Sequence, residues 1–209
     1  ILGFNSAEWV LFDLAAIAAG GCAAGIYTTC SPEEVQYIID HSEAKLVLLE
    51  NASQWEKVHA ELERMPKLQH VVMMSGAEAI DHEMVMTWDD FVAKAENVPQ
   101  SALDERLNGI TEEQVCTYIY TSGATGPPKA VMLTHKNLSW TATKAMDISE
   151  ATSADSSVSY LPLSHIAEQM FTIHAPISVG WPVYFAESIE LLPENLKEVQ
   201  PSIVFGVPR

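Results

Sequence analysis

The sequence has few cysteines and few basic residues, and both shortages exclude classes of function. Its three cysteines, Cys22, Cys30 and Cys116, are odd in number and form no CxxC pair, so neither a disulfide framework nor a zinc site is indicated. This usage fits a reduced, intracellular compartment. Only 11 Lys and Arg residues oppose 28 Asp and Glu residues, and the formal charge of −17 opposes non-specific binding to nucleic acid or to anionic lipid. A phosphate ligand would have to be held by local groups, against the field of the whole chain.

The sequence also has no hydrophobic run that reads as a membrane span. The nearest candidate, residues 10–26, is interrupted by Asp13 and broken by Gly20-Gly21, which predicts a buried helix followed by a strand. With 209 residues and 48% hydrophobic composition, the chain can bury the core of one large domain or two small ones. It opens on Ile1 rather than Met and stops at "FGVPR", directly after an apolar run, so we expect a piece of a longer protein.

Helix-start signals and apolar runs alternate along the chain. Strands alternating with helices predict βαβ units, and hence an α/β fold with mostly parallel sheets covered by helices. We divide the chain into an α/β portion at 1–110 and a second one at 111–209. Residues 97–109 are polar and turn-rich, which predicts a connector. Predicted N-caps are Asn5 with Glu8, Ser31 with Glu34, and Ser53 with Glu56; further helices are expected at 87–96, after His135, from about Ile166 and after Pro193; predicted strands are 23–29, 45–50, 70–74, 115–120, 130–134, 158–163, 182–186 and 202–206.

The stretch "YIYTSGATGPPKAVMLTHKN", residues 118–137, places a glycine-rich loop between two apolar runs. Glycines let backbone N–H groups turn toward an anion, hydroxyl side chains add donors, and Lys129 adds a positive charge. The spacing excludes the P-loop pattern G-x-x-x-x-G-K-[ST], because Gly123 and Gly126 are three residues apart and Lys129 is three further on. From the residues alone, two interpretations stay open: a phosphate cradle, or a glycine-rich turn with Lys129 on the surface.

The same stretch resembles the phosphate-loop signature Y-T-S-G-T-T-G-x-P-K-G-V of the adenylate-forming superfamily. Three further segments, "ILGFNSAEW", "GIYTTCSPEEVQYI" and "YLPLSHIAEQ", with "FGVPR" after them, are most similar to the bubblegum-type long-chain fatty acyl-CoA synthetases. The resemblance spans essentially the whole chain, and residues 75–108 contain nothing diagnostic of the family. It implies part of the large N-terminal domain of an adenylate-forming enzyme, without the C-terminal domain.

The resemblance implies a two-step reaction. A fatty acid carboxylate attacks the α-phosphate of ATP with Mg2+ present, and coenzyme A then displaces AMP from the acyl-adenylate. It implies that His165 lies beside the carboxylate and adenylate, and that Thr125 is nearest the magnesium. Peripheral association with the endoplasmic reticulum or other intracellular membranes is open for the longer protein, in an otherwise cytoplasmic location. The residues implied to cradle the phosphates are Thr121, Ser122, Gly123, Ala124, Thr125, Gly126 and Lys129.

The loop departs from the signature at two positions. Ala124 replaces a threonine, and a lost hydrogen bond there would cost on the order of 1 kcal/mol. Ala130 replaces a glycine, and if the backbone there has positive φ, alanine adds strain of about 1 kcal/mol. Glu168 either orients His165 or faces solvent. Two alternatives stay open beside the fatty acid ligase: a ligase for another carboxylic acid, and a non-catalytic nucleotide-binding or partner-binding fragment.

Overall fold

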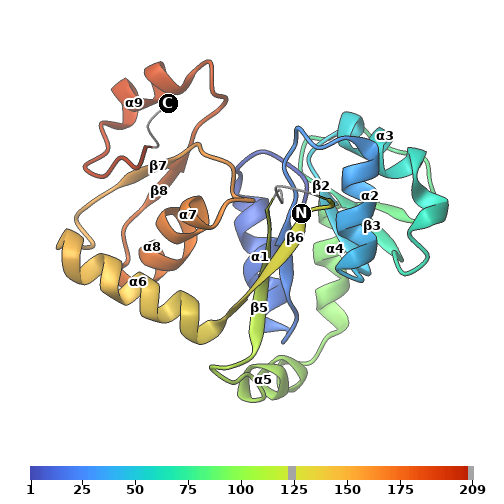
Figure 1. Cartoon of the computed structure of the whole chain (residues 1–209), viewed down its shortest axis with the longest axis horizontal. Coiled ribbons are helices and arrows are strands. Elements are labelled where there is room, and N and C mark those ends of the chain that lie inside the picture. Colours follow the sequence, from blue (N-terminus) through green and yellow to red (C-terminus); the bar gives the residue numbers. More distant parts are fainter. Residues whose placement is uncertain (122–125, 207–209) are drawn as a thin grey trace.

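Three small sheets with helices around them make up the computed structural model, which describes residues 1–121 and 126–206 (Figure 1). The central sheet has the order β1-β5-β6, the second β2-β3-β4, and the third pairs β7 with β8. Every pair is parallel except the β5-β6 hairpin, so the predicted α/β fold with mostly parallel sheets is confirmed. The strands are β1 (Ala23–Gly25), β2 (Leu46–Leu49), β3 (His70–Met73), β4 (Val85–Thr87), β5 (Val115–Thr121), β6 (Lys129–Thr134), β7 (Ser157–Ser159) and β8 (Val183–Phe185).

Capping residues determine where the helices begin. Before α2, the Ser31 side chain accepts a hydrogen bond from the Glu34 N–H while the Glu34 carboxylate accepts one from the Ser31 N–H, which confirms the predicted capping box. A π-helix, η3 (Met170–His174), joins α7 to α8. The helices are α1 (Ala7–Ala18), α2 (Pro32–His41), α3 (Ala52–Ala60), α4 (Trp88–Ala93), α5 (Gln100–Asn108), α6 (His135–Ser149), α7 (Ile166–Gln169), α8 (Ala175–Val179) and α9 (Leu192–Val199), with 3-10 turns η1 (Leu62–Arg64) and η2 (Lys94–Asn97).

Two predicted N-caps are wrong. Ser6, not Asn5, caps α1 by accepting from the Trp9 N–H at 3.1 Å, and Asn51, not Ser53, caps α3. Ser6 and Asn51 both have the extended backbone that a cap requires. The Asn5 side chain is instead buried and bonds to a distant segment.

Two other predictions fail. Most of the expected connector at 97–109 is α5, which has no buried residue and therefore carried no apolar period in the sequence. The run 202–206 forms a single parallel bridge, from Ile203 to Ser157, rather than a strand. The division at 110/111 stays a prediction. The central sheet contains β1 from the first predicted portion and β5 and β6 from the second.

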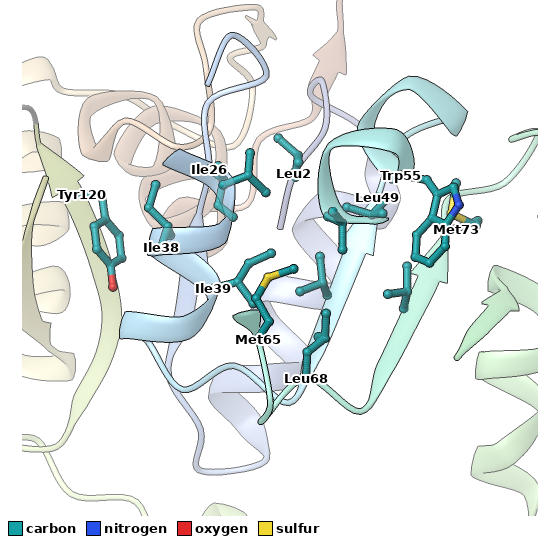
Figure 2. Close-up of a cluster of buried hydrophobic side chains, with 14 residues drawn as sticks. Leu2, Ile26, Ile38, Ile39, Leu49, Trp55, Met65, Leu68, Met73 and Tyr120 are labelled. Carbon is teal, nitrogen blue, oxygen red and sulfur yellow. The ribbon is translucent and has the colours of Figure 1, made fainter. Parts of the chain in front are cut away.

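Leu2 connects the first two sheets. It forms parallel bridges to both Ile26 and Leu49, and in Figure 2 its side chain lies between them in the main cluster of buried apolar residues. Ile38 and Ile39 of α2 cover this face of the sheets. Ile1 faces the other way, toward Trp9 and Phe12 of α1 and Leu163. Within residues 1–121 and 126–206, no helix is both long enough and apolar enough to cross a membrane.

His174, in the π-helix η3, is buried in an environment that disfavours its protonated form. Burial, together with the nearby His135, lowers the pKa of His174 to about 4. Among the described residues, neither His174 Nε2 nor His135 Nε2 has a hydrogen-bond partner. An unfolded histidine has a pKa of about 6.5. The unfolded chain therefore binds the proton between these two values while the folded chain does not.

We predict that this histidine destabilises the chain as the pH falls from about 6.5 to 4, by up to about 3 kcal/mol in all. In His174→Phe, the free energy of unfolding measured by urea denaturation should fall less steeply over this range than in the unchanged protein. His70→Gln, at an exposed histidine, is the control for the removal of an imidazole. Equal slopes in all three proteins would contradict the prediction.

Candidate functional site

The predicted phosphate loop lies at the turn of the β5-β6 hairpin. Thr121 at the end of β5 pairs with Lys129 at the start of β6, so the predicted loop connects two paired strands. β5 runs parallel to β1, with Ile119 opposite Gly25, and the two strands therefore end at the same edge of the sheet. In α/β sheets, ligands bind beyond the carboxyl ends of the strands, which is where this turn lies.

The described residues of the loop have the properties that an anion site needs. Thr121 and Lys129 are both exposed, and in the described ranges no carboxylate forms an ion pair with Lys129. Gly126 has φ +92°, a conformation that favours glycine. The four other residues of the predicted cradle, Ser122, Gly123, Ala124 and Thr125, lie outside the described residues.

Ala130 causes no strain in this structure. It pairs with Tyr120 in the regular part of β6, is partly buried against the main apolar cluster, and is not among the described residues with positive φ. Ala130 does not have a positive φ, so it does not add the backbone strain considered from the sequence.

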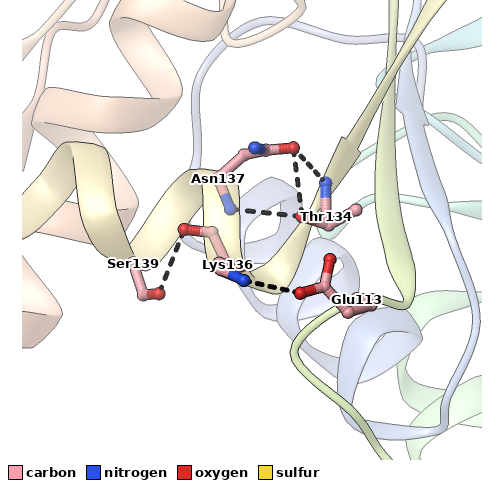
Figure 3. A network of polar contacts seen from close by, with 5 residues as sticks. All are labelled: Glu113, Thr134, Lys136, Asn137 and Ser139. Carbon is pink, nitrogen blue, oxygen red and sulfur yellow. Dashed lines mark hydrogen bonds and ion pairs between the residues drawn. The ribbon is translucent and has the colours of Figure 1, made fainter.

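The helix that follows the hairpin is anchored at its first turn (Figure 3). Thr134 and Asn137 form a capping box: the Asn137 N–H donates to Thr134 Oγ1 at 3.2 Å, and the Thr134 N–H donates to Asn137 Oδ1 at 3.0 Å. Lys136 pairs with Glu113, just before β5, at 2.7 Å. These bonds fix α6 to the base of the hairpin.

His165 is an exposed residue at the start of α7. Its Nδ1 accepts a hydrogen bond from the Ala167 N–H at 3.1 Å, so in the neutral ring the proton is on Nε2. The ring thus keeps an outward donor available to a ligand. Among the described residues no hydrogen bond joins Glu168 to this ring, so Glu168 does not orient it directly, and the alternative that Glu168 faces solvent is wrong.

Glu168 is buried instead, at 3% exposure, within a polar network behind His165. Its Oε1 accepts from the Ser159 and Thr172 hydroxyls at 2.8 and 2.9 Å and from the Tyr160 N–H at 3.0 Å. Burial raises the pKa of the Glu168 carboxyl, and these hydrogen bonds act in the opposite direction. The carboxylate joins β7 to the helix that carries the motif.

Asn5 completes this network from the other end of the chain. Its Nδ2 donates to Ser159 Oγ at 2.8 Å and to the Leu161 carbonyl at 2.7 Å, and its Oδ1 accepts from the Leu163 N–H at 3.2 Å. One buried amide therefore holds the backbone of the segment that leads to His165. The sequence reasoning missed this role because the same residue type is also a common N-cap.

A close backbone approach brings this segment onto the central sheet. A Cβ on Gly25 would lie 2.7 Å from the Cα of Ser164, so only glycine fits there. Gly25 belongs to β1, which pairs with β5, the strand that ends at the predicted phosphate loop. The structure thus packs the segment before His165 against β1, and the hairpin strand β5 pairs along one edge of β1.

No metal-binding cluster is visible in the described part of the chain. Residues 1–121 and 126–206 contain no group of three or more His, Cys, Asp or Glu side chains that could hold a metal ion. The predicted magnesium contact, Thr125, lies outside these ranges. Magnesium favours oxygen ligands. It usually binds a few protein oxygens together with substrate phosphates, so hydroxyl oxygens at a phosphate loop fit its chemistry.

Comparisons with known proteins show the family of the chain. The chain matches the model of the family described as "AMP-binding enzyme" over residues 1–209, and it belongs to that family. Among its relatives, it is 42% identical to "Long-chain-fatty-acid--CoA ligase ACSBG2" from Xenopus laevis and 40% identical to "Long-chain-fatty-acid--CoA ligase ACSBG1" from Bos taurus. Both alignments cover 100% of this chain but only 29% and 30% of those proteins.

Solved structures show the same fold. The anthranilate CoA ligase AuaEII in complex with anthranoyl-AMP matches 96% of this chain and 38% of its own, with a TM-score of 0.78 at 20% identity. The long-chain-fatty-acid-CoA ligase FadD1 from Archaeoglobus fulgidus matches 95% of this chain and 37% of its own, with a TM-score of 0.69 at 22% identity. The predicted fold type, that of adenylate-forming ligases, is confirmed.

We predict that Asn5→Ala destabilises the chain by about 3 kcal/mol, because it leaves buried backbone and hydroxyl groups without partners. Ser6→Ala, next to it, removes a helix cap and a weak hydrogen bond to Met74 Sδ at 3.6 Å, and should cost about 1 kcal/mol. Chemical denaturation of both variants measures the difference. Equal costs would contradict the role given to Asn5.

Gly25→Ala should cost about 2 kcal/mol, because backbone atoms must move to admit the Cβ. The control is Gly109→Ala, where a Cβ meets its nearest atoms at 3.4 Å and φ is −82°. The control should stay within about 0.5 kcal/mol of the unchanged protein. Thermal unfolding of the two variants side by side tests this, and a harmless Gly25→Ala would contradict it.

Proposed function

We propose that the chain is part of the large N-terminal domain of an enzyme that activates a long-chain fatty acid with ATP and transfers the acyl group to coenzyme A. The single observation that supports this most is about 40% identity to long-chain-fatty-acid–CoA ligases along the whole chain. The chain spans about three tenths of the length of those relatives. The complete activity thus belongs to the longer protein, and the chain alone should not turn over.

Two anions must meet for the first step, and the hairpin is placed to hold one of them. A carboxylate oxygen attacks the α-phosphorus of ATP, the bond to the pyrophosphate oxygen breaks, and an acyl-adenylate forms. We propose that the turn from Thr121 to Lys129 binds the β- and γ-phosphates. Lys129 supplies the positive charge, and Thr121, Ser122 and Thr125 supply hydroxyl donors. Gly123, Ala124 and Gly126 complete the turn with backbone groups.

Mg2+, when bound to ATP, would neutralise phosphate charge, and Thr125 is the residue of this chain that we propose to contact it. The role of Lys129 does not depend on that contact. Its ammonium group acts by position and charge, in a protein whose overall charge repels phosphate.

We propose that His165 borders the carboxylate and adenylate. Its Nδ1 is held by the Ala167 N–H, so its Nε2–H can donate to an anionic oxygen without first reorienting. The network of Asn5 and Glu168 positions this donor through the backbone rather than by contact with the ring.

The remaining proposals concern the longer protein. Its substrates would be a fatty acid, ATP and coenzyme A, with no nucleic acid partner, since the chain is strongly acidic. We place it in the cytoplasm, with peripheral attachment to the endoplasmic reticulum or other intracellular membranes as its membrane contact. We keep the division of this chain at 110/111. We assign the C-terminal domain of the enzyme to the rest of the longer protein.

Lys129→Ala tests the function and the site together. In the full-length enzyme, fatty-acid-dependent exchange of labelled pyrophosphate into ATP should fall by about 10- to 100-fold, the equivalent of losing a charged hydrogen bond. Lys136→Ala is the matched control, because Lys136 is a nearby exposed lysine paired with Glu113. A panel of long-chain, aryl and amino acids identifies the substrate class. Exchange with none of the fatty acids, or an equal loss in both variants, would contradict the proposal.

A further inference from the structure

The side chains at the end of the β5-β6 hairpin divide between the two faces of the central sheet. Gly25 lies opposite Ile119, and a Cβ on Gly25 would meet the backbone of Ser164, so Ile119 lies on the face on which Ser164 packs. Successive strand residues alternate between faces, which gives Thr121 the same face as Ile119. Lys129 pairs with Thr121 and therefore shares that face. Two side chains proposed to bind phosphate thus point to the side of the sheet that Ser164 covers.

The residue before Thr121, Tyr120, points to the opposite face, where α2 packs. Its side chain is 4% exposed and belongs to the main apolar cluster, together with Ile38 and Ile39 of α2 (Figure 2). Ala130, which lies opposite Tyr120 in the hairpin, packs against the same cluster. The position of Tyr120 on α2 therefore determines which residues at the end of the hairpin lie on the other face.

One hydrogen bond joins the hydroxyl of this tyrosine to α2. The Tyr120 hydroxyl lies 2.9 Å from Nδ1 of His41, in the last turn of the helix. Burial raises the pKa of Tyr120 to about 12, so the phenol keeps its proton and donates the hydrogen bond, and His41 Nδ1 accepts it. The His41 ring stacks on Tyr37, with ring centroids 5.2 Å apart and an angle of 24° between the planes. Tyr120 is thus held by a side chain that is itself packed on the helix.

The connection between β5 and β6 makes such a contact important for the register of the hairpin. A two-residue turn fixes the register by its own geometry. Here residues 122–128, which include two glycines, connect the strands, and a longer connection allows more conformations. A shift of the pairing by one residue moves every side chain of a strand to the other face, and Lys129 would then point toward α2. A contact that fixes Tyr120 on α2 therefore opposes that shift.

We propose that His41 is a positioning residue for the proposed phosphate loop. By accepting the hydrogen bond of Tyr120, it holds the end of β5 in the register that directs Thr121 and Lys129 to the face on which Ser164 packs. This inference rests on the proposed function for the role of the loop, and it adds a residue from the opposite face of the sheet. The side chains that depend on the register are those proposed to bind ATP, so the affinity for ATP is the quantity that His41 controls.

Four variants of the full-length enzyme separate this hydrogen bond from the other contacts of the two residues. Tyr120→Phe removes the donor and keeps the buried ring. His41→Phe removes the acceptor and keeps a ring to stack on Tyr37, whereas His41→Asn places an amide oxygen near the position of Nδ1 and removes the ring. Tyr37→Phe is the matched control, because it removes a hydroxyl that forms no hydrogen bond within residues 1–121 and 126–206 and keeps the stack.

The test measures the KM for ATP in fatty-acid-dependent exchange of pyrophosphate and the Kd of Mg·ATP by titration calorimetry. We expect Tyr120→Phe and His41→Phe each to raise both values by about 5- to 10-fold, as for one lost hydrogen bond, with the KM for the fatty acid within about twofold. The double variant should lose no more than either single variant, because both substitutions remove the same bond. His41→Asn and Tyr37→Phe should stay within about twofold of the unchanged enzyme. Loss of folded protein alone would lower the apparent kcat and leave the KM for ATP unchanged.

Three results would overturn the role of His41. They are an unchanged KM and Kd in Tyr120→Phe and His41→Phe, additive losses in the double variant, and a loss in His41→Asn as large as in His41→Phe. Absence of exchange with every fatty acid would refute the proposed function instead, and the Kd of Mg·ATP in the same variants would still support or overturn the role of His41. An unchanged enzyme that does not bind Mg·ATP would overturn both.

Discussion

The absence of a side chain at Gly25 is the constraint on which the site depends. It lets the backbone of Ser164 lie directly on β1, at a separation that leaves no room for a methyl group. β1 is paired along one edge with β5, which ends at the predicted phosphate loop. The central sheet thus carries both segments that the proposed reaction needs, one packed on β1 and one following β5, and any residue with a Cβ at position 25 would push the Ser164 segment away from the sheet.

Buried polar groups then fix the His165 segment on that strand. Burial of a carboxylate without partners is costly, yet Glu168 accepts hydrogen bonds from two hydroxyls and a backbone N–H. Asn5 satisfies backbone groups of the same segment from the other end of the chain. These bonds act on the backbone that carries His165, which leaves the ring itself accessible from solvent.

Local signals account for what the sequence predicts well. The capping box at Ser31 and the strand-loop-strand pattern around Lys129 each involve neighbouring residues, and the structure has both. The partners of Asn5 lie more than 150 positions away, so no local pattern could distinguish its network role from a helix cap. α5 has no buried residue, so its sequence needs no apolar period and shows none. The close approach at Gly25 is a tertiary contact, and a glycine in a strand pattern only hints at it.

The central claim is that the loop after β5 binds the phosphates of ATP and that the His165 segment, which packs on β1, borders the reacting carboxylate. A crystal structure of the full-length enzyme with a non-hydrolysable ATP analogue, magnesium and a long-chain fatty acid tests it most directly. The account predicts Lys129 Nζ within hydrogen-bond distance of the β- or γ-phosphate, and His165 Nε2 beside the carboxylate or α-phosphate. A nucleotide bound elsewhere, for example at the carboxyl ends of β3 and β4, would contradict it.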